Sequence, residues 1–182
     1  MDRICKGNWD CPESLHTDQL VRDVRILKSG TGSIVVPHYD FSVSRRDVGK
    51  SRRVDLAEMA SGDQQLVIIV EGLMIFHDAA LRALCDIRVF IDCDEDTRFM
   101  RRLARDTDPN GVGGRGRSAA SVYRAWSNVV KPAHHRYVEP TKRFAHLVVP
   151  SHKVLHCPLS LSLSLSLSVC LTQLTPNVPS YR

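Results

Sequence analysis

The stretch LVIIV, residues 66–70, constrains the fold more than any other part of the chain, because five apolar residues follow one another without a break. An extended segment of this kind is apolar on both faces, which is typical of a strand buried inside a sheet. Glu71 and Gly72 end the run. The sequence therefore predicts an interior strand whose carboxyl end carries an acidic side chain.

Further strands and helices follow from the pattern of apolar residues. IRVFI at 87–91 predicts a second buried strand, and HLVV at 146–149 a short third one. Apolar residues at helical spacing predict helices over 12–30, 77–85, 94–106 and 118–131, the last ended by Pro132. Strands that alternate with helices indicate an α/β fold with a parallel sheet.

The segments between these elements are less regular. Residues 33–41, SIVVPHYDF, predict a short extended stretch that Pro37 breaks. Residues 42–65 are polar and rich in arginine, and they predict a loop with one helical turn near LAEMA.

Composition and charge narrow the class of protein. A net charge of +5 in 182 residues suits an anionic ligand. The six cysteines include no Cys-x-x-Cys pair, and the N-terminus has no apolar segment of the kind found in signal peptides. No run reaches transmembrane length. We therefore expect a cytoplasmic protein with reduced thiols and without a membrane partner.

The composition changes after residue 150, so we divide the chain into a domain at 1–150 and a tail at 151–182. Residues 159–168 alternate strictly between leucine and serine. Such a segment reads as an amphipathic β-strand, but translation of a repeated CT dinucleotide gives the same pattern. We favour the second interpretation and expect a disordered tail without a function.

Glu71 is the first candidate for chemistry. Parallel strands direct their carboxyl ends toward the ligand crevice of such sheets. A carboxylate there can hold Mg²⁺, which bridges nucleotide phosphates. A strand-terminal glutamate that only reaches solvent is the alternative.

Arginines form the second candidate group. Arg98, Arg102 and Arg105 share a face of the predicted basic helix, and Arg115 and Arg117 follow a glycine-rich segment. Guanidinium groups bind phosphate oxygens and stabilise a transferring phosphoryl group, and a glycine-rich hinge suits a lid. A solvated basic face is the alternative. A nucleic-acid surface is a third interpretation, although the interleaved aromatic residues that would stack on bases are missing.

Two segments near the N-terminus supply the third group. Asp10 in NWDCPE can accept hydrogen bonds from vicinal ribose hydroxyls, and Tyr39 and Phe41 in PHYDF can flank a base. Buried aromatic residues beside a turn are the alternative. The histidines His134, His135 and His146 do not have metal-ligand spacing, and we expect them on the surface.

Taken in order, several blocks resemble the uridine kinase (uridine–cytidine kinase) family over residues 8–150. They are NWDCPESL, VVPHYDF, IIVEGLMIFHD, VFIDCDEDTRFMRRLARD, GRGRS and VKPAHHRYVEPTKRFAHLVVP. The resemblance implies a P-loop NTPase-type three-layer parallel sheet. It also implies ATP-dependent phosphorylation of the 5′-hydroxyl of uridine or cytidine, with Mg²⁺, in pyrimidine salvage.

The resemblance also assigns roles to residues of this sequence. Asp10 would hold the ribose hydroxyls, Tyr39 and Phe41 would line the nucleoside pocket, and Glu71 would serve the metal. Arg102 and Arg117 would approach the substrate or the transferring phosphoryl group, and Arg105 and Arg115 the nucleotide phosphates. The partners are then a nucleoside and ATP rather than nucleic acid, and self-association into a homo-oligomer stays open.

The sequence departs from the family in several respects. Ser44 replaces a histidine that contacts the base, and Ala125 replaces a pocket glutamine, which leaves the acceptor nucleoside open. No G-x-x-x-x-G-K-[ST] motif occurs in the 182 residues, and the early acid that activates the acceptor hydroxyl is missing too.

The strand that leads into the P-loop lies between the strands LVIIV and IRVFI in this fold. We therefore expect an incomplete sheet in which these two strands face a gap with unpaired backbone groups. Such a chain would fold poorly and be a poor kinase. Its missing strand would have been lost with an upstream exon or, as the alternative, would come from a second polypeptide. A non-catalytic nucleoside-binding or regulatory fragment, a pseudokinase, is the second functional hypothesis.

Overall fold

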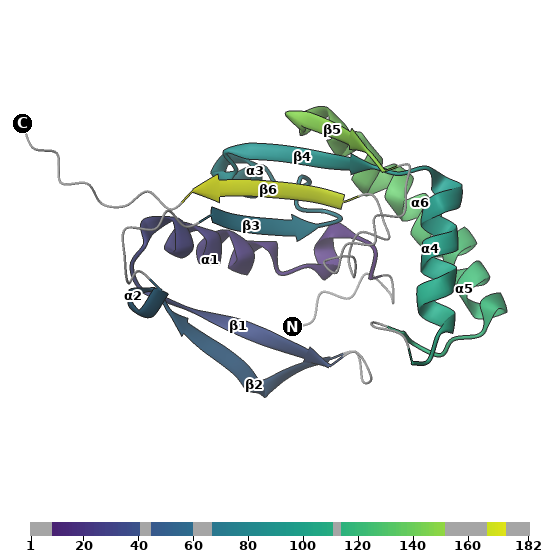
Figure 1. Cartoon of the computed structure of the whole chain (residues 1–182), viewed down its shortest axis with the longest axis horizontal. Helices are drawn as coiled ribbons and strands as arrows, with labels where there is room; N and C mark the ends of the chain where they lie inside the picture. The colour runs from purple at the N-terminus through teal and green to yellow at the C-terminus, as the bar shows by residue number, and fades with distance from the viewer. Residues whose placement is uncertain (1–8, 41–44, 60–66, 111–113, 152–166, 174–182) are drawn as a thin grey trace, which may run out of the picture.

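The structure is a computed structural model, which describes residues 9–40, 45–59, 67–110, 114–151 and 167–173. Phe41 and Ser44 lie outside the described residues. Strands and helices alternate along much of the chain, as predicted for an α/β fold (Figure 1).

In the described part of the chain, the main sheet has four strands in the order β3, β6, β4, β5 (Figure 1). Their bounds are β3 Val67–Gly72, β4 Ile87–Asp92, β5 Leu147–Pro150 and β6 Leu167–Gln173. β4 and β5 pair in parallel, and β6 runs antiparallel to both β3 and β4. It follows that β3, β4 and β5 all run in the same direction.

The strand β6 corrects two predictions. Residues 167–173 of the tail form a strand, so the prediction of a disordered tail is wrong for this segment. The strands β3 and β4 also do not face a gap, because β6 pairs with both of them. In register, Val70 lies opposite Cys170, and Cys170 lies opposite Arg88. Leucine and serine in alternation suit an extended backbone, and the pairing partners come from far away in the sequence.

A separate two-stranded sheet is formed by β1 (Ser33–Asp40) and β2 (Arg45–Asp55), which pair antiparallel. The register shifts between Val36 and His38, at Pro37, which has no backbone N–H to donate. The prediction of a loop over 42–65 is therefore wrong for residues 45–55, which form β2. The predicted helical turn near LAEMA is confirmed as α2 (Leu56–Met59).

The helix predicted over 12–30 is present as a short 3₁₀ turn η1 (Pro12–Ser14) and the helix α1 (Thr17–Ser29). Gly30 ends α1 in the left-handed conformation, with φ of 69°. The helices α3 (Ala79–Leu84) and α4 (Glu95–Thr107) are also confirmed. None of the described helices combines the length and the apolar composition that crossing a bilayer requires.

The predicted final helix is longer than expected, because Pro132 does not end it. The helix α5 (Ala119–Ala125) continues through further helical segments with local π and 3₁₀ geometry. These are η2 Trp126–Val130, α6 Lys131–Ala133, η3 His134–Val138 and η4 Glu139–Phe144. In the π turn that precedes Pro132, the N–H of Lys131 donates to the carbonyl oxygen of Trp126, and the helix continues past Pro132, which has no backbone N–H to donate.

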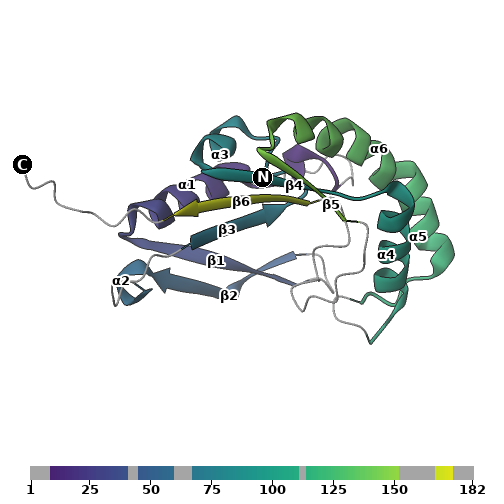
Figure 2. The same cartoon turned by 45° about the horizontal axis from the view of Figure 1, so that its top comes forward.

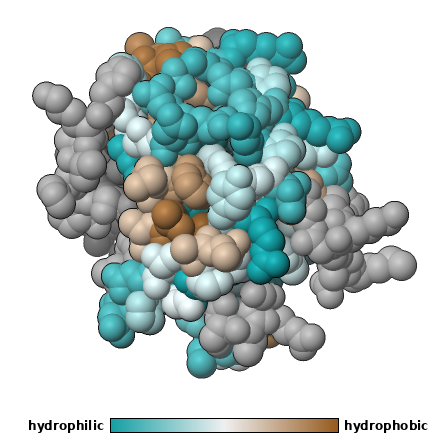
Figure 3. Space-filling model, turned by 90° about the vertical axis from the view of Figure 1, so that its right-hand side faces the viewer, coloured by the Kyte–Doolittle hydropathy of each residue, from teal (hydrophilic) through white to brown (hydrophobic). Residues whose placement is uncertain are grey.

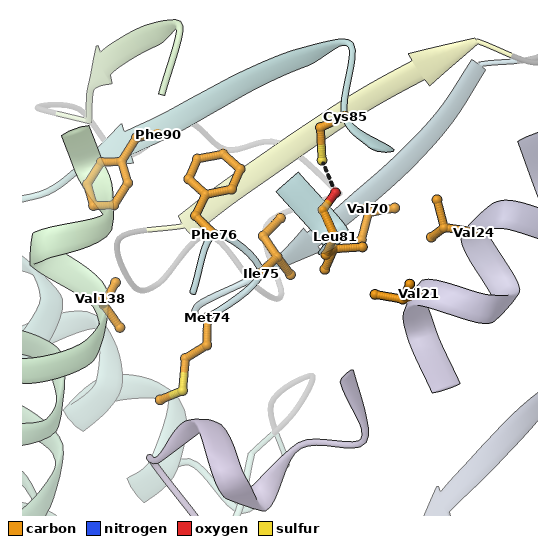
Figure 4. Packing of buried hydrophobic residues seen from close by; sticks show 10 residues of the cluster. All are labelled: Val21, Val24, Val70, Met74, Ile75, Phe76, Leu81, Cys85, Phe90 and Val138. Atoms are coloured by element: carbon orange, nitrogen blue, oxygen red, sulfur yellow. Dashed lines mark hydrogen bonds between the residues drawn. The ribbon is translucent and has the colours of Figure 1, made fainter. Parts of the chain in front are cut away.

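The hydrophobic core lies between the inner face of the main sheet and the helices α1 and α3 (Figure 4). Val24 of α1, Leu81 of α3 and Phe90 of β4 are all 0% exposed. Cys85, which follows α3, belongs to the same cluster and is disulfide-bonded. The expectation that all cysteines are reduced thiols is therefore wrong for Cys85, whereas Cys11 and Cys93 are thiols.

The outer face of the main sheet is exposed, which corrects the prediction that β3 is buried on both faces. Val67 and Ile69 are 58% and 64% exposed, and Val70 is the one buried residue of β3. The described helices α1 and α3 pack against the opposite face of the sheet (Figures 1 and 2). The apolar side chains of the outer face therefore lie outside the hydrophobic core.

Candidate functional site

The carboxylate of Asp106 lies at the centre of four arginines and is 0% exposed. Arg105 is closest, with Nη2 2.7 Å from Oδ1 and with Nε donating to the same oxygen at 2.8 Å. The other three arginines approach Oδ2: Arg102 Nε at 3.6 Å, Arg115 Nη1 at 3.6 Å and Arg117 Nη1 at 3.5 Å. We call these five residues the arginine cluster.

Two elements bring the cluster together. Arg102 and Asp106 lie one turn apart on the buried face of α4, and Arg105 is in the same last turn. The segment before α5 supplies the other two arginines, and the N–H of Arg117 donates to the carbonyl oxygen of Asp106 at 2.8 Å. Gly116, with φ of 58°, lets the backbone turn between Arg115 and Arg117.

The cluster is strongly positive, because four guanidinium charges meet one carboxylate and leave an excess of three positive charges. Burial lowers the pKa values of Arg102 and Arg115, and the charge of Asp106 acts in the opposite direction. Arginine nevertheless stays protonated in proteins, so the lowered pKa reflects a charge that is held at an electrostatic cost. An incoming anion would reduce this cost, and planar guanidinium groups match phosphate oxygens well.

Asp10 lies near this cluster, as its predicted role requires. It is half-buried and precedes the turn η1. After burial and Asp106, its charge is the next influence on the pKa of Arg102, which it raises. Asp10 and Arg102, predicted from separate blocks of sequence, are therefore close in space.

Glu71 is exposed at the carboxyl end of β3. β3 and β4 run in the same direction, and α4 starts shortly after β4 ends, so Glu71 lies at the edge of the sheet from which α4 begins (Figures 1 and 2). Within the described ranges, the side chain of Glu71 forms no hydrogen bond or ion pair. No group of three or more His, Cys, Asp or Glu side chains there is placed to hold a metal ion.

The predicted nucleoside pocket is described only in part. Tyr39 lies in β1, is 39% exposed and pairs in register with Arg46. The strand β1, which contains Tyr39, runs toward the side of the molecule with α4 (Figures 1 and 2). Phe41 lies outside the described residues, so its place in the pocket stays a prediction.

Arg98 shares the buried face of α4 with Arg102 but takes a different role. Its side chain is 4% exposed, its Nε donates to the carbonyl oxygen of Cys93 at 3.1 Å, and its guanidinium lies 5.6 Å from the centre of the Trp126 ring. Its Nη1 has no hydrogen-bond partner within the described ranges. Arg98 is therefore a buried packing residue rather than a member of the arginine cluster.

The prediction that all three histidines lie on the surface is wrong for His134. Its side chain is only 5% exposed, because η3 turns it inward, whereas His135 and His146 are exposed as predicted. Burial, followed by the charge of Arg98, lowers the pKa of His134 to about 4. This histidine is therefore neutral at neutral pH.

Ion pairs fix the start of α4 against the helices that follow. Lys131 Nζ lies 2.6 Å from Glu95 Oε1, and His135 Nε2 lies 3.0 Å from Glu95 Oε2. Lys142 Nζ lies 2.6 Å from Asp92 Oδ2. The sequence did not predict these contacts or the central role of Asp106, whose only sequence signal is an acid one turn after Arg102 in a basic helix.

Two hollows on the described surface are lined by residues outside the arginine cluster. One, of about 340 Å³, lies beside η1 and the start of α1, and its lining includes His77 and Asp78. The other, of about 330 Å³, lies between α4 and α5 and includes Phe99, Tyr123 and Trp126. Viewed from the side with α4 and α5, the surface is mainly hydrophilic, with hydrophobic patches at the centre and at the top of the view (Figure 3).

Comparison with known proteins gives consistent matches. A profile of the Phosphoribulokinase / Uridine kinase family matches residues 5–157. The chain is 39% identical over 150 residues to a uridine kinase of Leuconostoc citreum. The aligned segment covers 82% of this chain and 64% of that protein. It is 38% identical over 149 residues to a uridine kinase of Clostridium perfringens, with the same two coverages.

A plant protein matches over the same length. The chain is 36% identical over 150 residues to the uridine/cytidine kinase UKL1, chloroplastic, of Arabidopsis thaliana. The aligned segment covers 82% of this chain and 28% of that protein. The chain thus spans 64% of the length of these bacterial relatives and a smaller share of the plant protein.

Proposed function

Because this chain belongs to the phosphoribulokinase / uridine kinase family, we propose that it is a uridine kinase-like phosphotransferase. Its reaction would be the ATP-dependent phosphorylation of the 5′-hydroxyl of uridine or cytidine, in the cytoplasm. The observation that carries the proposal is the arginine cluster around buried Asp106, with Asp10 close to Arg102. In the proposal, the arginines would bind phosphate and Asp10 would bind the ribose hydroxyls, and the influence of Asp10 on Arg102 supports such an arrangement.

The cluster supplies the phosphate-binding part of the proposed site. Arg102 and Arg117 would contact the substrate and the transferring phosphoryl group, and Arg105 and Arg115 the phosphates of the nucleotide. Arg105 is held most tightly by Asp106, whereas Arg117 has a half-exposed side chain that can reach a ligand. Groups that are fixed before the ligand binds stabilise developing charge without further rearrangement.

The nucleoside would bind next to the cluster. Asp10 would accept hydrogen bonds from the ribose hydroxyls, and Tyr39 and Phe41 would flank the base. Ser44 and Ala125 offer smaller groups to the base than the histidine and glutamine of related pockets. We therefore expect weaker discrimination between uridine and cytidine, because base selection depends on hydrogen bonds from such groups.

The residues present fit a magnesium ion that arrives with the nucleotide. Glu71 is exposed, forms no ion pair within the described ranges and is not part of a three-residue ligand group. Mg²⁺ is commonly bound through one or two carboxylates together with phosphates and water. When bound, it would neutralise phosphate charge, and Glu71 would hold it at the edge of the sheet.

We expect the 182 residues alone to turn over slowly. They contain no G-x-x-x-x-G-K-[ST] motif, so the backbone amides and the lysine that cradle ATP phosphates would have to come from elsewhere. The second candidate function is therefore a nucleoside-binding fragment without catalysis. The position of β6 between β3 and β4 favours it, because an antiparallel strand occupies the centre of the sheet.

Calorimetry and an activity assay together test the proposal. Uridine is titrated into the purified chain with and without ATP and Mg²⁺, and formation of uridine 5′-monophosphate is followed by chromatography. Uridine binding that is lost in Asp10→Asn but kept in Asp18→Asn supports the nucleoside site. Asp18 is a suitable control because it is an exposed carboxylate paired with Arg22 at 3.2 Å.

The outcomes separate the two functions. Binding with turnover supports the kinase, and binding without turnover supports the non-catalytic fragment. Absence of uridine and cytidine binding, or equal binding by Asp10→Asn, would overturn both.

A further inference from the structure

The hollow between α4 and α5 is lined by aromatic rings from two parts of the chain. It has a volume of about 330 Å³, and Phe99 of α4, Tyr123 of α5 and Trp126 of η2 contribute to its wall. It lies on the side of the molecule that faces the viewer in Figure 3. A concave site of this size can enclose a small organic group.

The three rings are inclined to one another rather than stacked in parallel. The ring centres of Phe99 and Tyr123 are 6.2 Å apart with their planes at 76°, and those of Phe99 and Trp126 are 5.5 Å apart at 46°. Tyr123 is 60% exposed, so its ring is accessible to a ligand. The face of an aromatic ring carries partial negative charge and attracts cations.

One of these rings already contacts a cation that belongs to the protein. The guanidinium of Arg98 lies 5.6 Å from the centre of the Trp126 ring, and Arg98 is buried. Trp126 is held in this packing and is itself buried, so it forms a fixed part of the wall. Phe99 and Tyr123 provide the more accessible rings.

The charged residues in the wall leave one negative charge without a partner. Glu95 is engaged by Lys131 Nζ at 2.6 Å and by His135 Nε2 at 3.0 Å. Asp96 is exposed, and within the described part of the chain its side chain forms no hydrogen bond or ion pair. Asp96 lies three residues before Phe99 on α4, so the free carboxylate and the ring share one side of the helix.

We propose that this hollow binds the alkylated ammonium group of an organic cation. The methyl groups of such an ion spread its positive charge and pack against ring faces, and the ion needs one counter-charge, which Asp96 supplies. A primary ammonium fits less well, because each of its three N–H groups needs an acceptor when it leaves water, and Glu95 is already occupied.

Calorimetric titration of the unmodified chain with choline tests the proposal. The matched neutral ligand is 3,3-dimethylbutan-1-ol, which has the same shape but carbon in place of the charged nitrogen. We expect choline to bind with a Kd of about 1 mM, because the contacts are few and partly exposed, and the alcohol to bind at least about fivefold more weakly. Absence of choline binding, or equal affinities for the two ligands, would overturn the proposal.

Two variants test which side chains bind the cation. Tyr123→Leu should weaken choline binding about fivefold and Asp96→Asn about threefold, and both change exposed side chains that the fold does not depend on. Asp94→Asn is the matched control, because Asp94 is an exposed carboxylate outside the wall of the hollow, and it should bind choline like the unmodified chain. Unchanged affinity in both Tyr123→Leu and Asp96→Asn would overturn the proposal.

A third ligand identifies the source of the cation. Tighter binding of choline than of Nε-trimethyllysine amide indicates a free small molecule, and the reverse order indicates a modified side chain of a protein. Either order supports the site. The wall of the hollow lies outside the arginine cluster, so uridine binding is expected to be the same with and without choline, and failure of this proposal leaves the proposed phosphotransferase function unaffected.

Discussion

Asp106 and Arg117 are joined twice across the end of α4. The N–H of Arg117 donates to the carbonyl oxygen of Asp106 at 2.8 Å, and Arg117 Nη1 lies 3.5 Å from Asp106 Oδ2. One residue therefore fixes both the backbone and the side chain of the segment that follows Gly116. The proposed phosphate-binding residues depend on this buried acid for their position.

Replacement of this acid should destabilise the protein strongly. In Asp106→Asn, four guanidinium groups lose their common counter-charge, and removal of one partner from a buried ion pair costs about 3 kcal/mol or more. The measurement is the free energy of unfolding from urea denaturation, followed by tryptophan fluorescence and by circular dichroism. Asp18→Asn, which removes an exposed carboxylate from an i,i+4 pair, is the control and should keep the midpoint of the original chain. Equal midpoints for the two variants would contradict the central role of Asp106.

Polyphosphate anions should stabilise the protein through the arginine cluster. Pyrophosphate at about 100 times its Kd should raise the Tm by about 5 °C, because a ligand that binds only the folded state stabilises it by mass action. Arg115→Gln should reduce this rise, since it removes a guanidinium that lies 3.6 Å from Asp106. Arg22→Gln, at an exposed position of α1, should not. An equal rise in both variants would show that pyrophosphate binds elsewhere.

Acid should destabilise the protein through His134. Its pKa is about 4 in the folded protein and near the usual 6.5 when unfolded, so the unfolded chain takes up the proton first as the pH falls. The stability from the neutral ring is complete above about pH 6.5 and is lost progressively toward pH 4, by about 3 kcal/mol in total. Urea midpoints between pH 7 and pH 4.5 measure the effect.

The matched comparison for this pH dependence is between two neighbouring histidines. His134→Gln should flatten the dependence between pH 6.5 and 4.5, whereas His135→Gln, at an exposed position, should leave most of it in place. An identical pH profile for His134→Gln and the original chain would refute the assignment.

Gly116→Ala should lower the stability by about 1 kcal/mol, because a residue with a Cβ is strained at positive φ. The added Cβ would also lie 3.4 Å from Pro109 Cβ. Gly49→Ala is a close control, because its Cβ would meet Asp47 Oδ1 at the same 3.4 Å without a positive φ. Thermal unfolding of the two variants separates backbone strain from simple contact, and an equal loss in both would argue against strain at Gly116.

The sequence predicted the elements whose apolar pattern is local. Val24 of α1 and Phe90 of β4 are fully buried in the elements expected for them. Pro37 interrupts the ladder of β1 as expected for a residue without a backbone N–H. The proximity of Asp10 to Arg102 agrees with the predicted site, although the two residues come from distant blocks.

The elements that were missed depend on contacts between distant parts of the chain. The strand β2 is rich in arginine, and Arg52 and Arg53 are exposed, so pairing with β1 rather than burial of side chains defines it. The alternation in β6 was visible, but nothing local indicates that its place is between β3 and β4. The sequence did not distinguish Asp106 from the other charged residues of the basic helix. Two of its four arginine partners, Arg115 and Arg117, come from the segment after α4, and no local pattern predicts that contact.

The exposed outer face of the main sheet has a practical consequence for experiments. Val67, Ile69 and Ile87 are 58%, 64% and 44% exposed, so the native protein offers an adsorption surface to environment-sensitive dyes such as anilinonaphthalene sulfonate. Dye-based melting curves would start from a high background and understate the transition. Intrinsic tryptophan emission avoids this artefact, because Trp126 is 5% exposed in the folded state and reports on unfolding, whereas Trp9 is already 57% exposed.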